Sequence, residues 1–204
     1  MTNFIIVGIF VTFLMMGSSF KTIHLRGRRL REHSLFGNVG LFYGTSTGNT
    51  ENVASYFESE VEVVSYIDDL TDANSYDGYI FGVPTWHTDA DTERSGTSWD
   101  EWLYKTLPSM NFKGKKIAIY GVGDAVNYPE NFCDAMGELY DCFEKAGAQV
   151  FGATPTDIIE FSDSKSVRDG KFVGMVFDED NEPEKSEERV TFWIKMLKDE
   201  GFPL

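Results

Sequence analysis

The chain has 204 residues, a formal net charge of −15, 42% hydrophobic residues and 15% aromatic residues. A chain of this length suits one domain, which would bury roughly 70% of its unfolded surface and needs no disulfide or metal for stability. The ordinary hydrophobic content excludes a disordered or collagen-like chain. A multi-span membrane protein is excluded because no segment reaches the about 18 consecutive apolar residues of a membrane span.

The acidic charge lies after the N-terminal region. Residues 1–36 hold five basic residues and one acidic residue, whereas the remainder holds 13 basic and 32 acidic residues, a balance of −19. Such a surface repels nucleic acid and anionic membranes and attracts basic protein surfaces. An acidic surface that serves only solubility is the alternative.

Residues 1–36 have the composition of a targeting segment and not of a folded domain. An apolar run over residues 4–16, followed by small residues at 17–19, is typical of a secretory signal. Residues 21–36 are rich in arginine and poor in acids, which is typical of a transit peptide. The combination resembles the two-part plastid presequence of algae with complex plastids, in which an aromatic residue, here Phe20, follows the first cleavage point. That resemblance implies a mature protein in the plastid stroma; a plain secretory signal or an anchored N-terminus are the alternatives.

Two cysteines, Cys133 and Cys142, are the only ones in the chain. Nine positions apart in a predicted helix, they would face opposite sides of it and could not pair. No CxxC or Cys/His cluster occurs, which excludes zinc and iron–sulfur sites from the prediction. Reduced thiols in a reducing compartment are the expectation.

The rest of the chain alternates predicted strands and helices. Apolar runs predict strands at residues 39–43, 61–67, 79–83 and 117–120, covered on both faces. Apolar spacing, stop residues and a capping-box pair at Ser98 and Glu101 predict helices at residues 48–58, 99–107, 131–146 and 184–198. A fifth strand begins near Gln149 and resumes at residues 172–177, so the polar residues between them form an insertion. The sequence predicts one doubly wound, five-stranded α/β domain over residues 37–204.

In such sheets, ligands bind beyond the carboxyl ends of the strands. Residues 44–51, after the first strand, offer four hydroxyl side chains and a glycine at the start of a helix. Backbone N–H groups and the positive helix end can hold a phosphate there. The segment has no lysine and no GxGxxG pattern, so it is neither a Walker A loop nor a dinucleotide fingerprint. A bound monophosphate is predicted, with a capped threonine-rich turn as the alternative.

Two further loops each place an aromatic residue at the same edge. Trp86 follows the third strand, and Tyr128 follows the fourth, after Asp124 and two glycines. Each aromatic is either a platform for a planar ring or an ordinary surface or core residue. Together, the three loops predict a phosphate cup between two aromatic walls.

Four motifs resemble the flavodoxin family, in its long-chain algal and cyanobacterial type. They are Thr45-Ser-Thr-Gly-Asn-Thr50, Pro84-Thr-Trp86, Gly121-Val-Gly-Asp124 with Tyr128, and Ser164-Lys-Ser-Val-Arg-Asp-Gly-Lys-Phe-Val173. Residues 92–100 are particularly similar to red-algal members. The resemblance runs from about residue 39 to residue 204. It implies strand order 2-1-3-4-5, helices on both faces of the sheet, and a fifth strand interrupted by an insertion.

The resemblance also implies non-covalent FMN as the cofactor. The threonine-rich loop would hold its phosphate, Trp86 would stack on the inner face of the isoalloxazine and Tyr128 on the outer face, and Asp124 would contact the N3 edge. The FMN-binding residues that it implies are Thr45, Ser46, Thr47, Gly48, Asn49, Thr50, Pro84, Thr85, Trp86, His87, Gly123, Asp124, Tyr128, Asn131 and Cys133.

The sequence departs from the family at two positions after the tryptophan. The family usually has asparagine and, two places on, glycine, whereas this chain has His87 and Asp89. Glycine tolerates positive φ, so Asp89 should restrict reorientation of this loop. His87, with an ordinary pKa of about 6.5, is either a source of pH dependence in the flavin potential or a solvated loop residue.

As a function, the resemblance implies a low-potential one-electron carrier that shuttles FMN between semiquinone and hydroquinone. Photosystem I would be the donor and ferredoxin-NADP reductase the acceptor, with this monomeric protein replacing ferredoxin when iron is scarce. An FMN-dependent NAD(P)H quinone or nitro reductase on the same fold is the alternative. A phosphate-sensing module is a third class, but the acidic phosphoacceptor expected after its first strand is missing.

Overall fold

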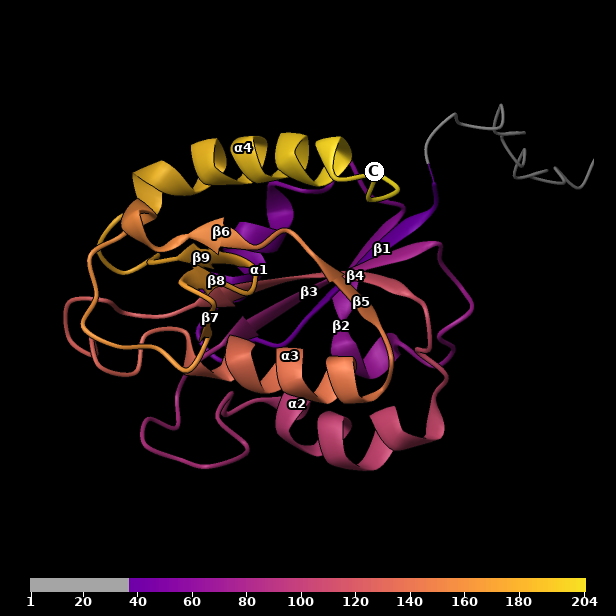
Figure 1. Ribbon diagram of the computed structural model, residues 1–204, viewed down its shortest axis with the longest axis horizontal. Coiled ribbons are helices and arrows are strands. Elements are labelled where there is room, and N and C mark those ends of the chain that lie inside the picture. Colours follow the sequence, from indigo (N-terminus) through magenta and orange to yellow (C-terminus); the bar gives the residue numbers. More distant parts are fainter. Residues whose placement is uncertain (1–36) are drawn as a thin grey trace, which may run out of the picture. The chain divides into compact units, whose positions relative to one another are not determined.

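A parallel sheet forms the centre of the computed structural model, which describes residues 37–204. The predicted presequence lies in residues 1–36, outside the described residues. The main sheet contains β1 (Val39–Tyr43), β2 (Val63–Tyr66), β3 (Gly78–Pro84), β4 (Lys116–Val122), β5 (Gln149–Phe151) and β9 (Met175–Phe177). Its hydrogen-bonded order is β2-β1-β3-β4-β5, every pair is parallel, and β9 also pairs with β4 (Figure 1). The predicted order and the split fifth strand are therefore confirmed.

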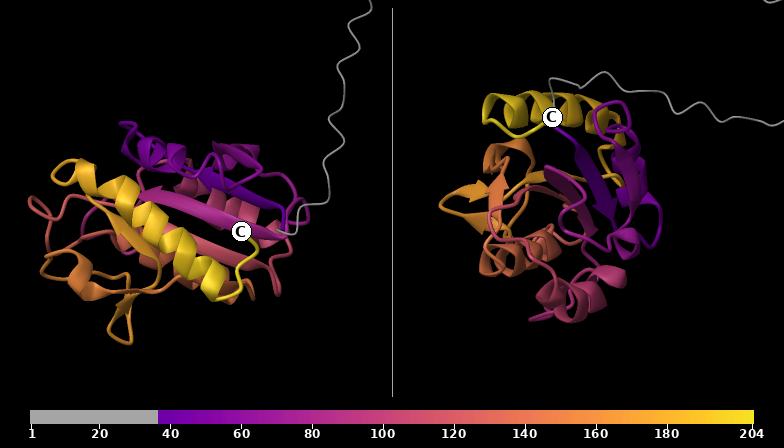
Figure 2. Two further views of the ribbon diagram at one scale, coloured as in Figure 1. Left: turned by 90° about the horizontal axis from the view of Figure 1, so that it is seen from above. Right: turned by 90° about the vertical axis from the view of Figure 1, so that its right-hand side faces the viewer.

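Helices cover both faces of this sheet, as predicted. One face packs against α1 (Asn49–Ser55) and α4 (Ser186–Asp199), and the other against α2 (Ser98–Glu101) and α3 (Asp134–Lys145). Figure 2 shows α4 lying along one side of the sheet, in yellow. Short helical turns are η1 (Ile67–Asp69), η2 (Trp102–Thr106), η3 (Leu107–Ser109), η4 (Thr156–Ile158) and η5 (Pro183–Lys185). Within residues 37–204, no helix is both long enough and apolar enough to cross a bilayer.

Alternating strand residues divide the core into two clusters, because successive side chains of a strand point to opposite faces. Ile80 of β3 packs on the side of α1 and α4, whereas Phe81 packs on the side of α2 and α3. The ring of Phe81 stacks on that of Phe143 from α3, with centroids 4.6 Å apart. Burial of both faces explains the continuous apolar runs in the sequence.

The insertion between β5 and β9 forms a small structure of its own. It contains an antiparallel sheet of β6 (Thr154–Pro155), β8 (Lys171–Phe172) and β7 (Val167–Arg168). The prediction that residue 172 belongs to the fifth strand of the main sheet was wrong. The main strand resumes only after Gly174, where an added Cβ would lie 1.8 Å from the Ile119 carbonyl oxygen.

The helix predicted over residues 99–107 is not a continuous α-helix. After α2, the chain forms a π-helical turn, η2, and then the 3₁₀ turn η3. Pro108 lacks an N–H, so a regular ladder of i to i−4 hydrogen bonds cannot run through it. The predicted capping box is also absent: the cap is Thr97, whose hydroxyl accepts a hydrogen bond from the Trp99 amide at 3.3 Å.

The start of α3 also differs from the prediction. The helix begins at Asp134, and Cys133 precedes it in the left-handed region, with φ of 56°. Cys133 is therefore outside the helix, and the argument from opposite helix faces does not apply to it. Both thiols are nevertheless free, as expected, and Cys133 is completely buried.

Candidate functional site

A cavity of about 290 Å³ lies where β1, β3 and β4 end. The three loops predicted to meet at this edge all contribute to its wall. The lining residues are Thr45, Thr47, Asn49, Thr50, Pro84, Thr85, Trp86, Thr88, Val122, Gly123, Asp124, Tyr128, Asn131 and Asp180. The carboxyl ends of parallel strands meet at one edge of a sheet, which is why segments far apart in sequence converge here.

Four of the predicted residues do not line the cavity. The Ser46 hydroxyl donates to the Gly96 carbonyl at 3.2 Å, and Gly48 is the left-handed cap of α1, with φ of 96°. His87 Nδ1 lies 2.6 Å from the Glu93 carbonyl oxygen. Cys133 lies beneath Gly123, where an added Cβ would be 3.0 Å from the Cys133 nitrogen. A direct role in binding stays a prediction for each of these residues.

Three lining residues were missed by the sequence analysis. Thr88 and Val122 adjoin predicted residues, and Asp180 follows β9. Asp180 Oδ1 accepts a hydrogen bond from Asn49 Nδ2 at 3.1 Å. The signal for Asp180 was present, because the second half of a split parallel strand must end at the same edge as its neighbours.

The first loop forms the hydroxyl-rich end of the cavity. Thr45 Oγ1 accepts a hydrogen bond from the Gly48 amide at 3.0 Å, which closes the turn before α1. No side chain caps this helix, and its first N–H groups have no intrahelical acceptor. Thr50 is completely buried, and its Oγ1 has no hydrogen-bond partner among the described residues.

An unpaired buried hydroxyl costs free energy, so the Thr50 hydroxyl is a position where a ligand acceptor would be favourable. Adjacent hydroxyl and amide donors suit phosphate oxygens. The residues present therefore fit the phosphate of the predicted cofactor.

Trp86 and Tyr128 provide exposed aromatic surface at the cavity. Their exposed fractions are 49% and 55%, although both follow buried strands. Half-exposed aromatic side chains beside a cavity are suited to contact with a planar ring. The amides of Trp86 and His87 both donate to the Arg94 carbonyl, at 3.0 Å each. These bonds fix the base of the loop over residues 85–97, between β3 and α2, which we call the tryptophan loop.

The Asp124 carboxylate binds mainly to its own loop. It accepts hydrogen bonds from the amides of Val126 and Asn127 and from the side-chain amides of Asn127 and Asn181. Partial burial raises the pKa of Asp124, but these hydrogen bonds outweigh it and hold the pKa below its usual value. The carboxylate thus orders the Tyr128 loop, and its predicted contact with the N3 edge of a flavin stays a prediction.

Asp89 adopts a backbone conformation that glycine adopts more easily. Its φ is 64°, in the left-handed region, where aspartate is tolerated better than most residues. Asn131 Nδ2 donates to Asp89 Oδ1 at 3.2 Å, which connects this loop to the start of α3. The hydrogen bond from Asn131 holds Asp89 in this conformation. Restricted reorientation of the loop at Asp89 stays a prediction.

Comparisons with known proteins agree with this architecture. Residues 41–193 match the family model described as flavodoxin. The chain is 40% identical to the flavodoxin of Synechococcus elongatus over 171 residues, covering 79% of this chain and 96% of that protein. Identity to the flavodoxin of Synechocystis sp. is also 40%, over 169 residues, covering 78% of this chain and 95% of that protein.

Solved structures give the same result. The crystal structure of Fusobacterium nucleatum flavodoxin bound to flavin mononucleotide aligns with a TM-score of 0.69 and 27% identity. The alignment covers 80% of this chain and 98% of that one. On its sequence, its sheet order and the position of its cavity, the chain belongs to the flavodoxin family.

Proposed function

We propose that this protein is a low-potential one-electron carrier that binds FMN non-covalently. The observation that carries the proposal is one cavity that joins the unpartnered buried hydroxyl of Thr50 to the exposed rings of Trp86 and Tyr128. FMN has a phosphate at one end and a planar ring system at the other, so it matches both ends. The flavin mononucleotide in the Fusobacterium relative supports the same assignment.

In this proposal, the chain binds and orients the cofactor. The Thr45, Thr47, Asn49 and Thr50 side chains, with the first amides of α1, hold the phosphate, and Trp86 and Tyr128 hold the ring. FMN, when bound, supplies the electron-transfer chemistry, and the protein tunes it. The acidic balance of −19 after residue 36 disfavours added negative charge, which lowers the reduction potential.

The relatives named above are flavodoxins, which supports the carrier over the reductase alternative. A quinone or nitro reductase needs room for a substrate over the flavin ring. With Trp86 stacked on one face of the ring and Tyr128 on the other, the edge of the ring and not its face would be left for exchange with a partner. This arrangement favours electron transfer between proteins.

We further propose that photosystem I reduces this protein and that ferredoxin-NADP reductase oxidises it, in transient complexes of a monomer in the plastid under iron limitation. The acidic surface supports docking to basic redox partners. The composition of residues 1–36 supports plastid import through a two-part presequence. Sequencing the N-terminus of the native protein tests that import route, and a mature start at Met1 or Phe20 would exclude two-step removal.

A visible-spectrum redox titration of the purified protein tests the central proposal. A yellow protein that is reduced in two separate one-electron steps, the second at low potential, is the expected result. A single two-electron step, together with steady-state oxidation of NAD(P)H by the protein alone, would favour the reductase. A colourless protein that does not bind added FMN would overturn the assignment of the cavity.

A further inference from the structure

The segment Ser164-Lys165-Ser166 of the insertion is fixed to the start of α3. Both serines are buried: Ser164 Oγ donates to the Phe132 carbonyl and Ser166 Oγ to the Cys133 carbonyl, each at 2.5 Å. The Lys165 amide donates to Asp134 Oδ1 at 2.7 Å. These three bonds fix the position of the Lys165 backbone.

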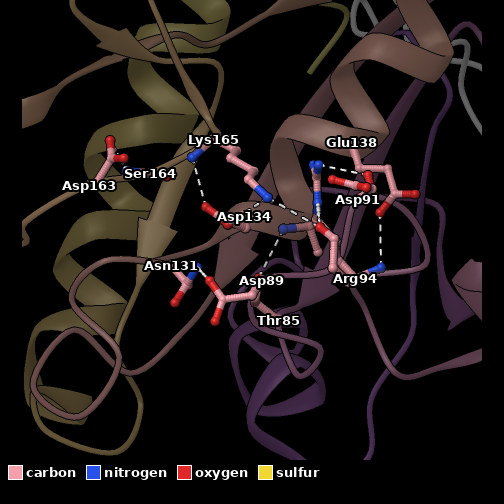
Figure 3. Close-up of polar contacts among 12 residues, drawn as sticks. Thr85, Asp89, Asp91, Arg94, Asn131, Asp134, Glu138, Asp163, Ser164 and Lys165 are labelled. Carbon is pink, nitrogen blue, oxygen red and sulfur yellow. Dashed lines mark hydrogen bonds and ion pairs between the residues drawn. The ribbon is translucent and has the colours of Figure 1, made fainter.

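Gly137 of α3 makes this contact possible. A Cβ added at Gly137 would lie 2.1 Å from the Lys165 carbonyl oxygen and 3.1 Å from the Ser166 Cα. The insertion therefore packs directly against the helix backbone. From this position, the side chain of Lys165 extends toward the loop after β3, as Figure 3 shows.

The Lys165 ammonium contacts both α3 and the tryptophan loop. Its Nζ donates to the Ala90 carbonyl at 3.2 Å and lies 4.0 Å from Asp134 Oδ2 (Figure 3). The Asp134 side chain is almost completely buried, and a buried carboxylate is costly unless it is paired and hydrogen-bonded. The buried charge thus favours this one position of the ammonium, against the Ala90 carbonyl.

The same loop is held at a second point by Glu138 of α3. Glu138 is 5% exposed and accepts hydrogen bonds from two consecutive amides, Glu93 at 2.8 Å and Arg94 at 3.0 Å. The Arg94 guanidinium in turn donates to the carbonyls of Ala90 and Asp91, at 2.9 and 2.8 Å. The loop is therefore held to α3 through Glu138 and to the insertion through Lys165.

We propose that Lys165 is a positioning residue, through which the insertion sets the shape of residues 88–94 at the cavity. This segment begins at Thr88, which lines the cavity together with nearby Trp86, and it contains Asp89 in its left-handed conformation. The inference rests on the proposed function, because the cavity wall that Lys165 shapes is the one assigned to the FMN ring. It gives the insertion a role in binding the cofactor and in setting its potential.

Lys165→Met tests this proposal, because it keeps the aliphatic stem and removes the donor and charge. Lys171→Met is the matched control: Lys171 is an exposed lysine of the same insertion, and its side chain makes no hydrogen bond or ion pair among the described residues. Lys165→Arg is the conservative rescue variant. Amide exchange of residues 88–95 in the apoprotein reports loop order, and titration with FMN and redox titration report the cofactor site.

The expected result is faster amide exchange in this loop for Lys165→Met, FMN binding weakened by about threefold to tenfold, and shifted midpoint potentials. Lys165→Arg should keep wild-type exchange and affinity, and Lys171→Met should change neither. Unchanged loop exchange in Lys165→Met would overturn the proposal. So would equal effects of the two methionine variants, or faster exchange with unaltered affinity and potentials. If the wild-type protein does not bind FMN, the proposed function fails, while faster exchange in the Lys165→Met apoprotein still supports control of the cavity wall by Lys165.

Discussion

The hydroxyl of Tyr120 donates to the carbonyl of Thr50 at 2.9 Å, and both residues are completely buried. Tyr120 lies in β4 and Thr50 in the first turn of α1, so the bond joins the sheet to the hydroxyl-rich end of the cavity. Gly82 of β3 makes room for the ring, because an added Cβ there would lie 2.2 Å from the Tyr120 hydroxyl. The phosphate end of the site is thus positioned from beneath by the core.

Removing this hydroxyl with Tyr120→Phe should lower the free energy of unfolding of the apoprotein by about 1 kcal/mol, the usual net value of one hydrogen bond. Urea denaturation measures the change. Tyr56→Phe is the control, since Tyr56 is only partly buried and its hydroxyl makes no hydrogen bond among the described residues. Equal stability of the two variants would mean that the Tyr120 hydroxyl does not hold α1.

Thr50→Val should separate stability from cofactor binding, because it replaces the unpartnered Oγ1 with a methyl group of similar size. We expect the free energy of unfolding of the apoprotein to stay unchanged or to rise by no more than about 1 kcal/mol. FMN affinity should fall about tenfold or more, since a hydrogen bond to a charged phosphate is lost. Fluorescence titration with FMN measures the affinity, and Thr71→Val, at an exposed threonine, is the control. A stability loss without an affinity loss would contradict the phosphate assignment.

Continuous apolar runs and the rule for parallel sheets were sufficient to predict the strands and the edge where the loops meet, whereas the order of the strands came from the resemblance to flavodoxins. The segments that contain Trp86, Tyr128 and Thr50 were predicted to meet for that reason, because each segment follows a buried strand. The same rule applies to Asp180 after β9, although only the loops after the first, third and fourth strands were predicted to form the site.

Contacts between side chains distant in sequence could not be predicted in this way. Lys165 lies 75 residues from Ala90, and no local pattern reveals that its ammonium meets that carbonyl. The left-handed conformation of Cys133 is a second example, and the hydroxyl of Ser166, from the insertion, donates a hydrogen bond to the Cys133 carbonyl. Local propensity alone favoured extending α3 through this residue, and tertiary packing prevents it.

The free energy of unfolding should depend on pH in the acidic range through the ionisation of Glu182. Its Oε1 lies 2.5 Å from Lys185 Nζ and its Oε2 lies 2.6 Å from Arg189 Nη2. The hydrogen bond from Lys185, and with it that from Arg189, holds the pKa of Glu182 below its usual value, although partial burial acts in the opposite direction. Because the folded-state pKa is lowered, this contribution to stability is present above the unfolded-state pKa of about 4.3 and is lost as pH falls through the folded-state value.

Glu182→Gln should therefore reduce the free energy of unfolding at neutral pH by less than about 1 kcal/mol, with the difference from wild type vanishing at low pH. Urea denaturation at a series of pH values between about 3 and 7 measures this difference in the free energy of unfolding. Only pH values at which the protein refolds are used. Glu184→Gln, at an exposed neighbour, is the control and should give a difference that does not depend on pH in the same way. A constant difference for Glu182→Gln across the range would contradict the ion-pair explanation.

Asp180 places a carboxylate beside the proposed phosphate, where it competes for the Asn49 side-chain amide. Asp180→Asn should tighten FMN binding about threefold, because it removes a negative charge near a dianion while leaving a side chain of the same shape. Asp157→Asn, at an exposed aspartate outside this cavity, makes the same change in net charge and is the control. Titrations with FMN at low and high salt should show the gain for Asp180→Asn diminishing as ionic strength rises, because dissolved ions screen the repulsion. Equal gains in FMN affinity from both variants would indicate an effect of total charge. Weaker FMN binding in Asp180→Asn would indicate that the carboxylate orders Asn49 for the phosphate instead of repelling the phosphate.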